Sequence, residues 1–372
     1  MPSSTSSSRR LNAADRPGVA QPVPVRDVPD RPWPAMLIGA LLLAIALTGV
    51  WEWHWRAFGA VPGYVDDDAL WAQQRRRIDA GEGNATVLIG ASRTIFDIQL
   101  PIWERLSGQR PIQLALVGTS PVPELEDLAN DQSFTGRLLI GIAPDIFFSG
   151  YSYRGSAFAF WRKESPAQRA SKVLSMYLVE RWLASDDPDF ALFTVLRRQP
   201  WPPRKDLPEH TDVRKLLVSD ADRSSFLWSK VATDPAYRAL ARSIWAQEFN
   251  DPPPTPQEGA EAQKTLEEQI GRAAAAVAKL RARGVPVIFV RHPSAGDYLA
   301  FENRALPRAV SWNPLIAKSG APGVYFEDYQ ELRDGYELPE WSHMTQDSAE
   351  RYTAALYQIL QRDFRPPDGK RW

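Results

Sequence analysis

The chain has 372 residues, of which 44% are hydrophobic and 24% charged, the composition of a globular protein with a sizeable core. Its formal net charge is -1 and it has no cysteine, which argues against a nucleic-acid partner and excludes disulfides, thiol catalysis and thiolate metal sites. None of the four histidines has the spacing of a helical zinc site, so we expect neither a metal nor a cofactor.

The N-terminal part of the chain has the pattern of a membrane anchor. Residues 1–34 are rich in serine, proline and arginine and predict a disordered tail. An uncharged apolar run follows, and tryptophans on both sides extend it to residues 35–55, the length of a transmembrane helix. Arginines in the tail favour a cytoplasmic N-terminus, so the rest of the chain would lie in the periplasm, outside a bacterial inner membrane. We expect an uncleaved signal anchor; the alternative is a cleaved signal peptide, for which residues 57–60 are a weak match.

Residues 56–85 are expected to form a linker and helical lead-in to a domain over residues 86–364. In that domain short, continuously apolar runs alternate with helical patterns, and such runs are typical of strands buried on both faces. The pattern predicts an α/β fold with a doubly wound parallel sheet. The expected strands are 86–90, 111–117, 137–143, 285–291 and 324–329, and helices are expected at 98–107, 122–131 and 345–362.

Residues 150–284 interrupt this alternation and are predicted to be almost wholly helical, with helices near 165–185, 222–248 and 257–283. We interpret them as a helical insertion or cap on the sheet and not as a separate domain.

Ligands of an open α/β sheet bind beyond the carboxyl ends of the strands, which selects the loops that could carry chemistry. The residues that these loops contribute are Ser92 and Arg93, Gly118, Asp145, His292, and the pair Glu340 and His343.

A serine at a tight strand-to-helix turn exposes its hydroxyl, as Ser92 would after a small Gly-Ala pair. Serine is a poor nucleophile until a histidine removes its proton, and that histidine needs a carboxylate to hold its tautomer. Glu340 and His343 are three residues apart in one predicted loop, a spacing that lets the carboxylate reach the imidazole. These three residues are therefore the candidate catalytic set.

The sequence resembles the SGNH (GDSL-like) hydrolase superfamily in these motifs. The family's first block corresponds to Gly90-Ala-Ser92-Arg93, its glycine after the second strand to Gly118, and its final Asp-x-x-His to Glu340-Trp-Ser-His343. The resemblance covers residues 86–148 and 285–362 and is greatest to the membrane-anchored branch with polysaccharide O-acetylation proteins and the D-alanyl-transfer protein of teichoic acid synthesis. It implies a flavodoxin-like sheet, Ser92 and His343 as catalytic pair, and Gly118 in the oxyanion hole.

The chain departs from the family pattern at two positions. Glu340 replaces the usual aspartate, and the third block, residues 141–145, has no asparagine for the oxyanion hole. An ionised Asp145 would repel an oxyanion, so backbone N–H groups of Ser92 and Gly118 are the expected donors.

Each candidate also has an interpretation without catalysis. Ser92 could be a turn or helix-capping serine, His343 a core histidine, Glu340 a solvated acid and Gly118 a turn glycine. Three further residues are candidates for substrate binding with structural alternatives: Arg93 (pairing with an internal acid), Asp145 (a cap or turn) and His292 (a packed loop residue).

We expect a serine-dependent acyl-ester hydrolase or O-acyltransferase that modifies a cell-surface or exported polysaccharide. The resemblance implies a membrane-bound acyltransferase as partner, besides the lipid bilayer. The alternative is a non-catalytic SGNH-like protein that binds a glycan or assembles an envelope polysaccharide system. A third hypothesis, an inner-membrane scaffold, predicts no ligand cavity at the strand ends.

Overall fold

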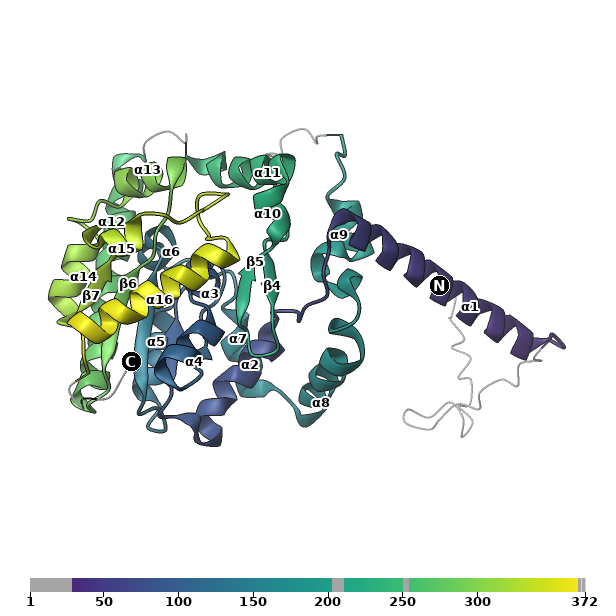
Figure 1. Ribbon diagram of the computed structural model, residues 1–372, viewed down its shortest axis with the longest axis horizontal. Helices are drawn as coiled ribbons and strands as arrows, with labels where there is room; N and C mark the ends of the chain where they lie inside the picture. The colour runs from purple at the N-terminus through teal and green to yellow at the C-terminus, as the bar shows by residue number, and fades with distance from the viewer. Residues whose placement is uncertain (1–28, 203–210, 250–253, 367–368, 370–371) are drawn as a thin grey trace, which may run out of the picture. The chain divides into compact units, whose positions relative to one another are not determined.

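The computed structural model describes residues 29–202, 211–249, 254–366, 369 and 372, and the chain divides into two units, Met1–Trp51 and Glu52–Trp372 (Figure 1). Most of the predicted disordered tail, residues 1–28, lies outside the described residues. The first helix begins at Trp33, two residues before the predicted start of the anchor at residue 35.

The first helix, α1 (Trp33–Phe58), is long and apolar enough to span a membrane. It has 26 residues, a mean hydropathy of 2.1 in its apolar window and no buried residue. At 1.5 Å per residue it is about 39 Å long, compared with about 30 Å for the hydrocarbon core of a bilayer. Its last two turns, from Glu52 onward, belong to the second unit.

The second unit contains a sheet of five parallel strands in the order β2-β1-β3-β6-β7. Every residue of β1, β3 and β6 is buried, which confirms that the continuous apolar runs are central parallel strands. The strands are β1 (Thr86–Ile89), β2 (Ile112–Gln113), β3 (Arg137–Ile142), β6 (Val287–Arg291) and β7 (Gly323–Tyr325).

Two of the edge strands are shorter than predicted. β2 covers only two residues of the expected 111–117, although Leu114 and Leu116 still donate hydrogen bonds to Leu88 and Gly90 along β1. β7 ends at Tyr325 because Phe326–Asp328 turns into a 3-10 helix, where the sequence predicted a strand through residue 329.

The helices that pack around the sheet form two groups, and the predicted helices at 98–107, 122–131, 257–283 and 345–362 are confirmed within a few residues. One group is α5 (Val122–Asn130), α6 (Pro144–Ser149), α12 (Pro256–Ala282) and α14 (Trp312–Ser319). The other is α3 (Ser92–Asp97), α4 (Leu100–Ser107), α15 (Gln330–Arg333) and α16 (Gln346–Asp363). The lead-in contains α2 (Asp68–Arg77), and α13 (Gly296–Ala305) follows β6.

Residues 150–284 are not wholly helical as predicted, because they contain a two-stranded antiparallel sheet of β4 (Leu217–Ser219) and β5 (Ser225–Leu227). Arg223 lies in the turn between the strands with a φ of 64°, and its buried guanidinium binds Asp66. The predicted helix 222–248 is therefore wrong in its first part. The helices are α7 (Ser156–Lys163), α8 (Pro166–Ser175) with its π-helical continuation η3 (Met176–Glu180), α9 (Leu192–Arg197), α10 (Ser229–Thr233) and α11 (Pro235–Trp245).

Candidate active site

Ser92 lies at the first position of α3, directly beyond the carboxyl end of β1. The turn requires Gly90, which has a φ of 152°, since a Cβ there would come within 2.1 Å of Thr94 Oγ1 and 3.0 Å of the Gly141 carbonyl oxygen. The five residues that follow Ser92 in α3 are buried, whereas Ser92 is only half-buried. The tight turn therefore leaves the serine accessible on an otherwise buried helix.

The structure brings Ser92, His343 and Glu340 together in one hydrogen-bonded chain. His343 Nε2 lies 2.8 Å from Ser92 Oγ, and His343 Nδ1 lies 3.0 Å from Glu340 Oε1. His343 is 2% exposed and Glu340 is fully buried. A carboxylate can only accept hydrogen bonds, so its contact with Nδ1 favours the tautomer in which Nε2 accepts the serine proton. This is the connectivity of a Ser-His-acid triad.

The loop that carries Glu340 and His343 is held by an unusual backbone conformation. Trp341 has a φ of 75°, one of two positive values among the described non-glycine residues. The glutamate side chain curls back and accepts a hydrogen bond from the His343 backbone N–H at 2.6 Å as well as from the ring. The glutamate side chain is long enough for one carboxylate oxygen to accept hydrogen bonds from both the backbone and the ring of His343.

Neighbouring contacts fix Trp341 in that conformation. Its carbonyl accepts a hydrogen bond from Ala295 N, and the Arg242 guanidinium lies 4.9 Å from its ring centroid. A Cβ on Gly296 would lie 2.6 Å from the indole, so only glycine lets the ring pack there. Left-handed backbone in a bulky residue persists only where packing holds it, and such strain clusters at functional sites.

Trp245 completes the site from the insertion, at the end of α11, and the sequence analysis did not single it out. Its indole N–H donates to Glu340 Oε2 at 2.5 Å, so the oxygen that does not contact His343 is also satisfied. One turn earlier, Arg242 Nε donates to the Pro339 carbonyl at 2.8 Å. The insertion therefore supplies contacts that hold the carboxylate and its loop. No local pattern distinguishes this tryptophan among the fourteen in the chain.

Asp97 provides a second tie between the nucleophile helix and the loop. Its Oδ1 accepts a hydrogen bond from Met344 N at 3.1 Å, and its backbone carbonyl accepts one from Thr353 Oγ1 in α16. Burial, together with repulsion from Glu340, raises the pKa of Asp97 well above its ordinary value. Asp97 therefore anchors the residue after His343 to the helix that carries Ser92.

Arg93 is buried and pairs with an internal acid, the structural alternative noted above. Its Nη1 lies 2.7 Å from Glu302 Oε1, and its Nε donates to Ser342 Oγ at 3.2 Å. Glu302 also pairs with Arg291 at 2.7 Å. Arg93, which is 2% exposed, makes a positioning contact beside His343, and its role in substrate binding stays a prediction.

His292 has the contacts of a packed structural residue, and its role in substrate binding stays a prediction. It is fully buried, with Nδ1 3.1 Å from Tyr352 Oη and Nε2 3.4 Å from Thr94 Oγ1. Burial and the positive charges of Arg93 and Arg291 lower the pKa of His292 to about 3, so the ring is neutral near pH 7. Both ring nitrogens have hydroxyl partners, which leaves neither for a ligand.

Asp145 and Gly118 are the remaining predicted residues. Asp145 Oδ2 accepts a hydrogen bond from Tyr298 Oη at 2.6 Å, and burial raises the pKa of Asp145. Its Oδ1 is buried and has no partner among the described residues. Gly118 has a φ of 55°, and its carbonyl accepts a hydrogen bond from Tyr153 N at 3.0 Å. Neither Ser92 nor Gly118 uses its N–H in a hydrogen bond within the described chain.

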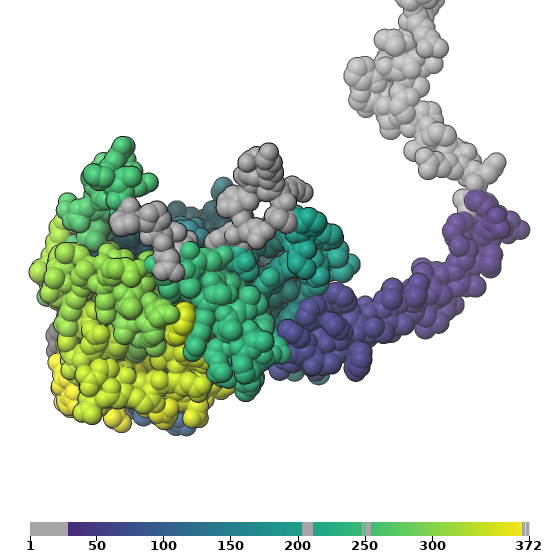
Figure 2. Space-filling model, turned by 90° about the horizontal axis from the view of Figure 1, so that it is seen from above, coloured from purple at the N-terminus to yellow at the C-terminus, as the bar shows by residue number. Residues whose placement is uncertain are grey.

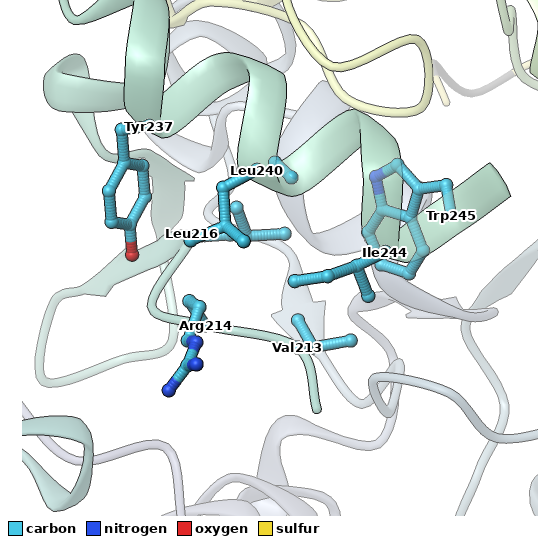
Figure 3. A pocket seen from close by; sticks show the side chains of 8 residues that line it. Val213, Arg214, Leu216, Tyr237, Leu240, Ile244 and Trp245 are labelled. Atoms are coloured by element: carbon cyan, nitrogen blue, oxygen red, sulfur yellow. The ribbon is translucent and has the colours of Figure 1, made fainter. Parts of the chain in front are cut away.

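A shallow surface cavity with no room for a water molecule adjoins Trp245 but is not lined by Ser92 or His343 (Figure 3). Its walls come from α11 and from the segment before β4, and they include Val213, Leu216, Ile244 and Trp245. This cavity therefore does not test the scaffold hypothesis, which concerns space between the serine and the histidine.

No protein-family model matches this sequence, and a search of curated proteins finds no relative.

Proposed function

We propose that the protein is a serine acyl-ester enzyme with Ser92 as nucleophile, His343 as general base and acid, and Glu340 as the group that orients His343. The observation that carries the proposal is the continuous chain of 2.8 and 3.0 Å contacts from Ser92 Oγ through both ring nitrogens of His343 to a buried carboxylate. A helix-capping serine or a packed histidine does not need this arrangement. The class we propose is the SGNH type, supported by the strand order and by the motifs at the strand ends.

The reaction follows from the positions of the protons. Ser92 Oγ attacks the ester carbonyl while His343 Nε2 takes its proton, and collapse of the tetrahedral intermediate expels the alcohol, which receives that proton from His343. A second oxygen nucleophile then gives its proton to His343 and bonds to the acyl carbon, and the bond to Ser92 Oγ breaks as Oγ takes that proton back from His343. Water as that nucleophile gives hydrolysis, and a sugar hydroxyl gives transfer.

The oxyanion would be stabilised by the backbone N–H groups of Ser92 and Gly118, neither of which donates to another group of the described chain. Asp145 occupies the region where the family has an asparagine, and its Oδ2 accepts a hydrogen bond from Tyr298 Oη at 2.6 Å. Removal of one oxyanion donor typically costs about 10²–10³ in rate, so a site with two backbone donors is compatible with slow acyl transfer.

The substrate that we propose is a cell-surface or exported polysaccharide, with a membrane-bound acyltransferase as donor partner. Support comes from α1, which would act as an uncleaved single-pass anchor in a bacterial inner membrane. The arginines before it favour a periplasmic catalytic domain. The choice of polysaccharide rests on the family resemblance, a weaker argument than the geometry of the site.

The test is ester turnover by the full chain in detergent, with p-nitrophenyl acetate as substrate. We expect release of p-nitrophenol and a transient acetyl adduct on Ser92 in peptide mass spectra, both absent from Ser92→Ala and His343→Ala. Addition of an oligosaccharide acceptor would distinguish transfer from hydrolysis through the appearance of acetylated sugar. A folded wild-type protein that is no more active than Ser92→Ala would favour the non-catalytic glycan-binding or assembly protein instead.

A further inference from the structure

An exposed apolar surface lies on the insertion, on α8–η3 and α9. Six large side chains between 57% and 79% exposed define this apolar surface: Leu174, Tyr177, Leu178, Trp182, Leu192 and Phe193. Scattered exposed apolar residues are normal, but a group of this size within twenty residues of sequence marks an interaction site. Figure 1 shows α8 and α9 on the same side of the domain, away from α14 and β7.

The helix α8–η3 turns most of its large apolar side chains outward and buries only Met176 among them. Its apolar side chains at Leu174, Tyr177 and Leu178 face outward. The side chains buried against the protein include Lys172 and Glu180, which form an ion pair at 3.0 Å. Because a soluble helix buries its apolar stripe, this arrangement indicates that the outward stripe has an apolar environment of its own.

The apolar surface lies where the chain enters the domain from its apolar N-terminal helix. Glu52 accepts hydrogen bonds at 2.9 Å from the backbone N–H groups of Ala184 and Ser185. Arg56 donates to the carbonyl of Trp182 at 2.8 Å, a residue of the apolar surface itself. Trp55 stacks on Phe190 with ring centroids 4.6 Å apart. The residues that directly follow the apolar span are therefore fixed to the segment between the two parts of the apolar surface.

Side chains beside the apolar surface have the chemistry of a membrane interface. Arg181 is exposed, and its guanidinium carbon lies 4.8 Å from the ring centroid of Trp182. Arg197 is exposed next to Leu196 at the end of α9. Tryptophan, tyrosine and arginine are the residues that favour the headgroup region of a bilayer, with leucine and phenylalanine below it.

We propose that this apolar surface inserts into the lipid bilayer that α1 spans, so that the domain is held on the membrane by a second, interfacial contact. The bilayer is the occupant that these observations favour, because the apolar surface is continuous with the point where the chain leaves the span. The proposal rests on α1 as a membrane anchor but not on the acyl-transfer chemistry. It would fix the orientation of the domain above the lipid surface.

The full chain offers a direct test because it has no cysteine, so one introduced thiol carries one probe. Leu178→Cys and Phe193→Cys would be labelled with an environment-sensitive fluorophore and reconstituted into phosphatidylglycerol–phosphatidylcholine vesicles with or without brominated lipids. Gln330→Cys, at an exposed position on α15, is the matched water-exposed control. Leu42→Cys within α1 reports whether the anchor itself is inserted.

We expect blue-shifted emission and quenching by brominated lipid at positions 178, 193 and 42, and neither effect at 330. Quenching at 42 without quenching at 178 and 193 would overturn the surface proposal and leave the anchor intact. Blue-shifted probes at 178 and 193 that resist lipid quenching would also overturn it, because a protein or a second copy of the chain would then cover the surface. The absence of quenching at all three positions would show that α1 is not inserted, and would overturn the proposal because it rests on that anchor.

Discussion

The carboxyl edge of the parallel sheet and the insertion at 150–284 contribute to the same site in different ways. The edge supplies the groups that would react: Ser92 after β1, and His343 in the loop before α16. The insertion supplies Trp245 and Arg242, which donate hydrogen bonds to Glu340 and to the Pro339 carbonyl in its loop. The position of Ser92 and His343 follows from the sheet, whereas Trp245 and Arg242 adjust the loop that carries Glu340. Substitutions in the two groups should therefore lower the rate of ester turnover by different amounts.

Glu340→Gln should have the largest effect among changes that leave Ser92 and His343 in place. An amide at this position supports the wrong tautomer of His343 and cannot stabilise the imidazolium, so we expect a loss of about 10²–10⁴ in the rate of ester turnover. The measurement is the p-nitrophenol release rate with the unfolding midpoint as a control for folding. A folded variant with an unchanged rate would remove Glu340 from the triad.

Trp245→Phe tests the contribution of the insertion. It removes one hydrogen bond to a buried carboxylate, worth about 1.5–3 kcal/mol, so we expect a loss of roughly ten- to a hundredfold in kcat with little change in KM. The matched control is Trp103→Phe in α4, a fully buried tryptophan that does not contact Glu340. Equal losses in both variants would show general destabilisation instead of a specific role for α11.

The sequence predicted Glu340 as a site residue but did not predict Trp245. Ser92, Glu340 and His343 follow from the rule that sites lie at the carboxyl ends of parallel strands. Trp245 contacts Glu340, which is 95 residues away in the sequence. No local sequence pattern predicts which residue the tryptophan at the end of α11 will contact. The same reason explains why the pairing of Arg93 with Glu302, 209 residues apart, stayed one of two alternatives.

In the fold, the long buried strands and long helices were predictable because their patterns repeat over many residues. The three-residue strands β4 and β5 were not, since they depend on the turn that Arg223 forms by binding Asp66 across 157 residues. The secondary structure that local sequence patterns did not predict is therefore determined by tertiary contacts.

Gly296→Ala should have a smaller effect, transmitted through the strained loop. The new methyl would contact the Trp341 indole at 2.6 Å and displace the turn between Glu340 and His343, so we expect a roughly tenfold loss in turnover rate. Gly259→Ala is the control, because a Cβ there meets no atom within 4 Å. Turnover that is unchanged in a folded Gly296→Ala variant would show that the loop tolerates the displacement.

His292→Gln should leave ester turnover nearly unchanged and alter only the pH dependence of stability. Because the pKa of His292 falls to about 3 in the folded protein, the unfolded chain binds a proton below about pH 6.5 that the folded chain does not. Wild-type stability is therefore lost as the pH falls from about 6.5 toward 3. Urea unfolding at pH 7 and pH 4 should show a smaller loss in the variant. A folded His292→Gln variant without ester turnover would show that His292 takes part in the reaction.

The central claim, that Ser92 is an activated nucleophile, is tested most directly by a fluorophosphonate probe on the full chain. Peptide mapping should find one adduct, on Ser92, and the adduct should be absent from Ser92→Ala and from folded His343→Ala. An adduct that persists in His343→Ala at the wild-type rate, or no adduct on the folded wild-type protein, would contradict the claim.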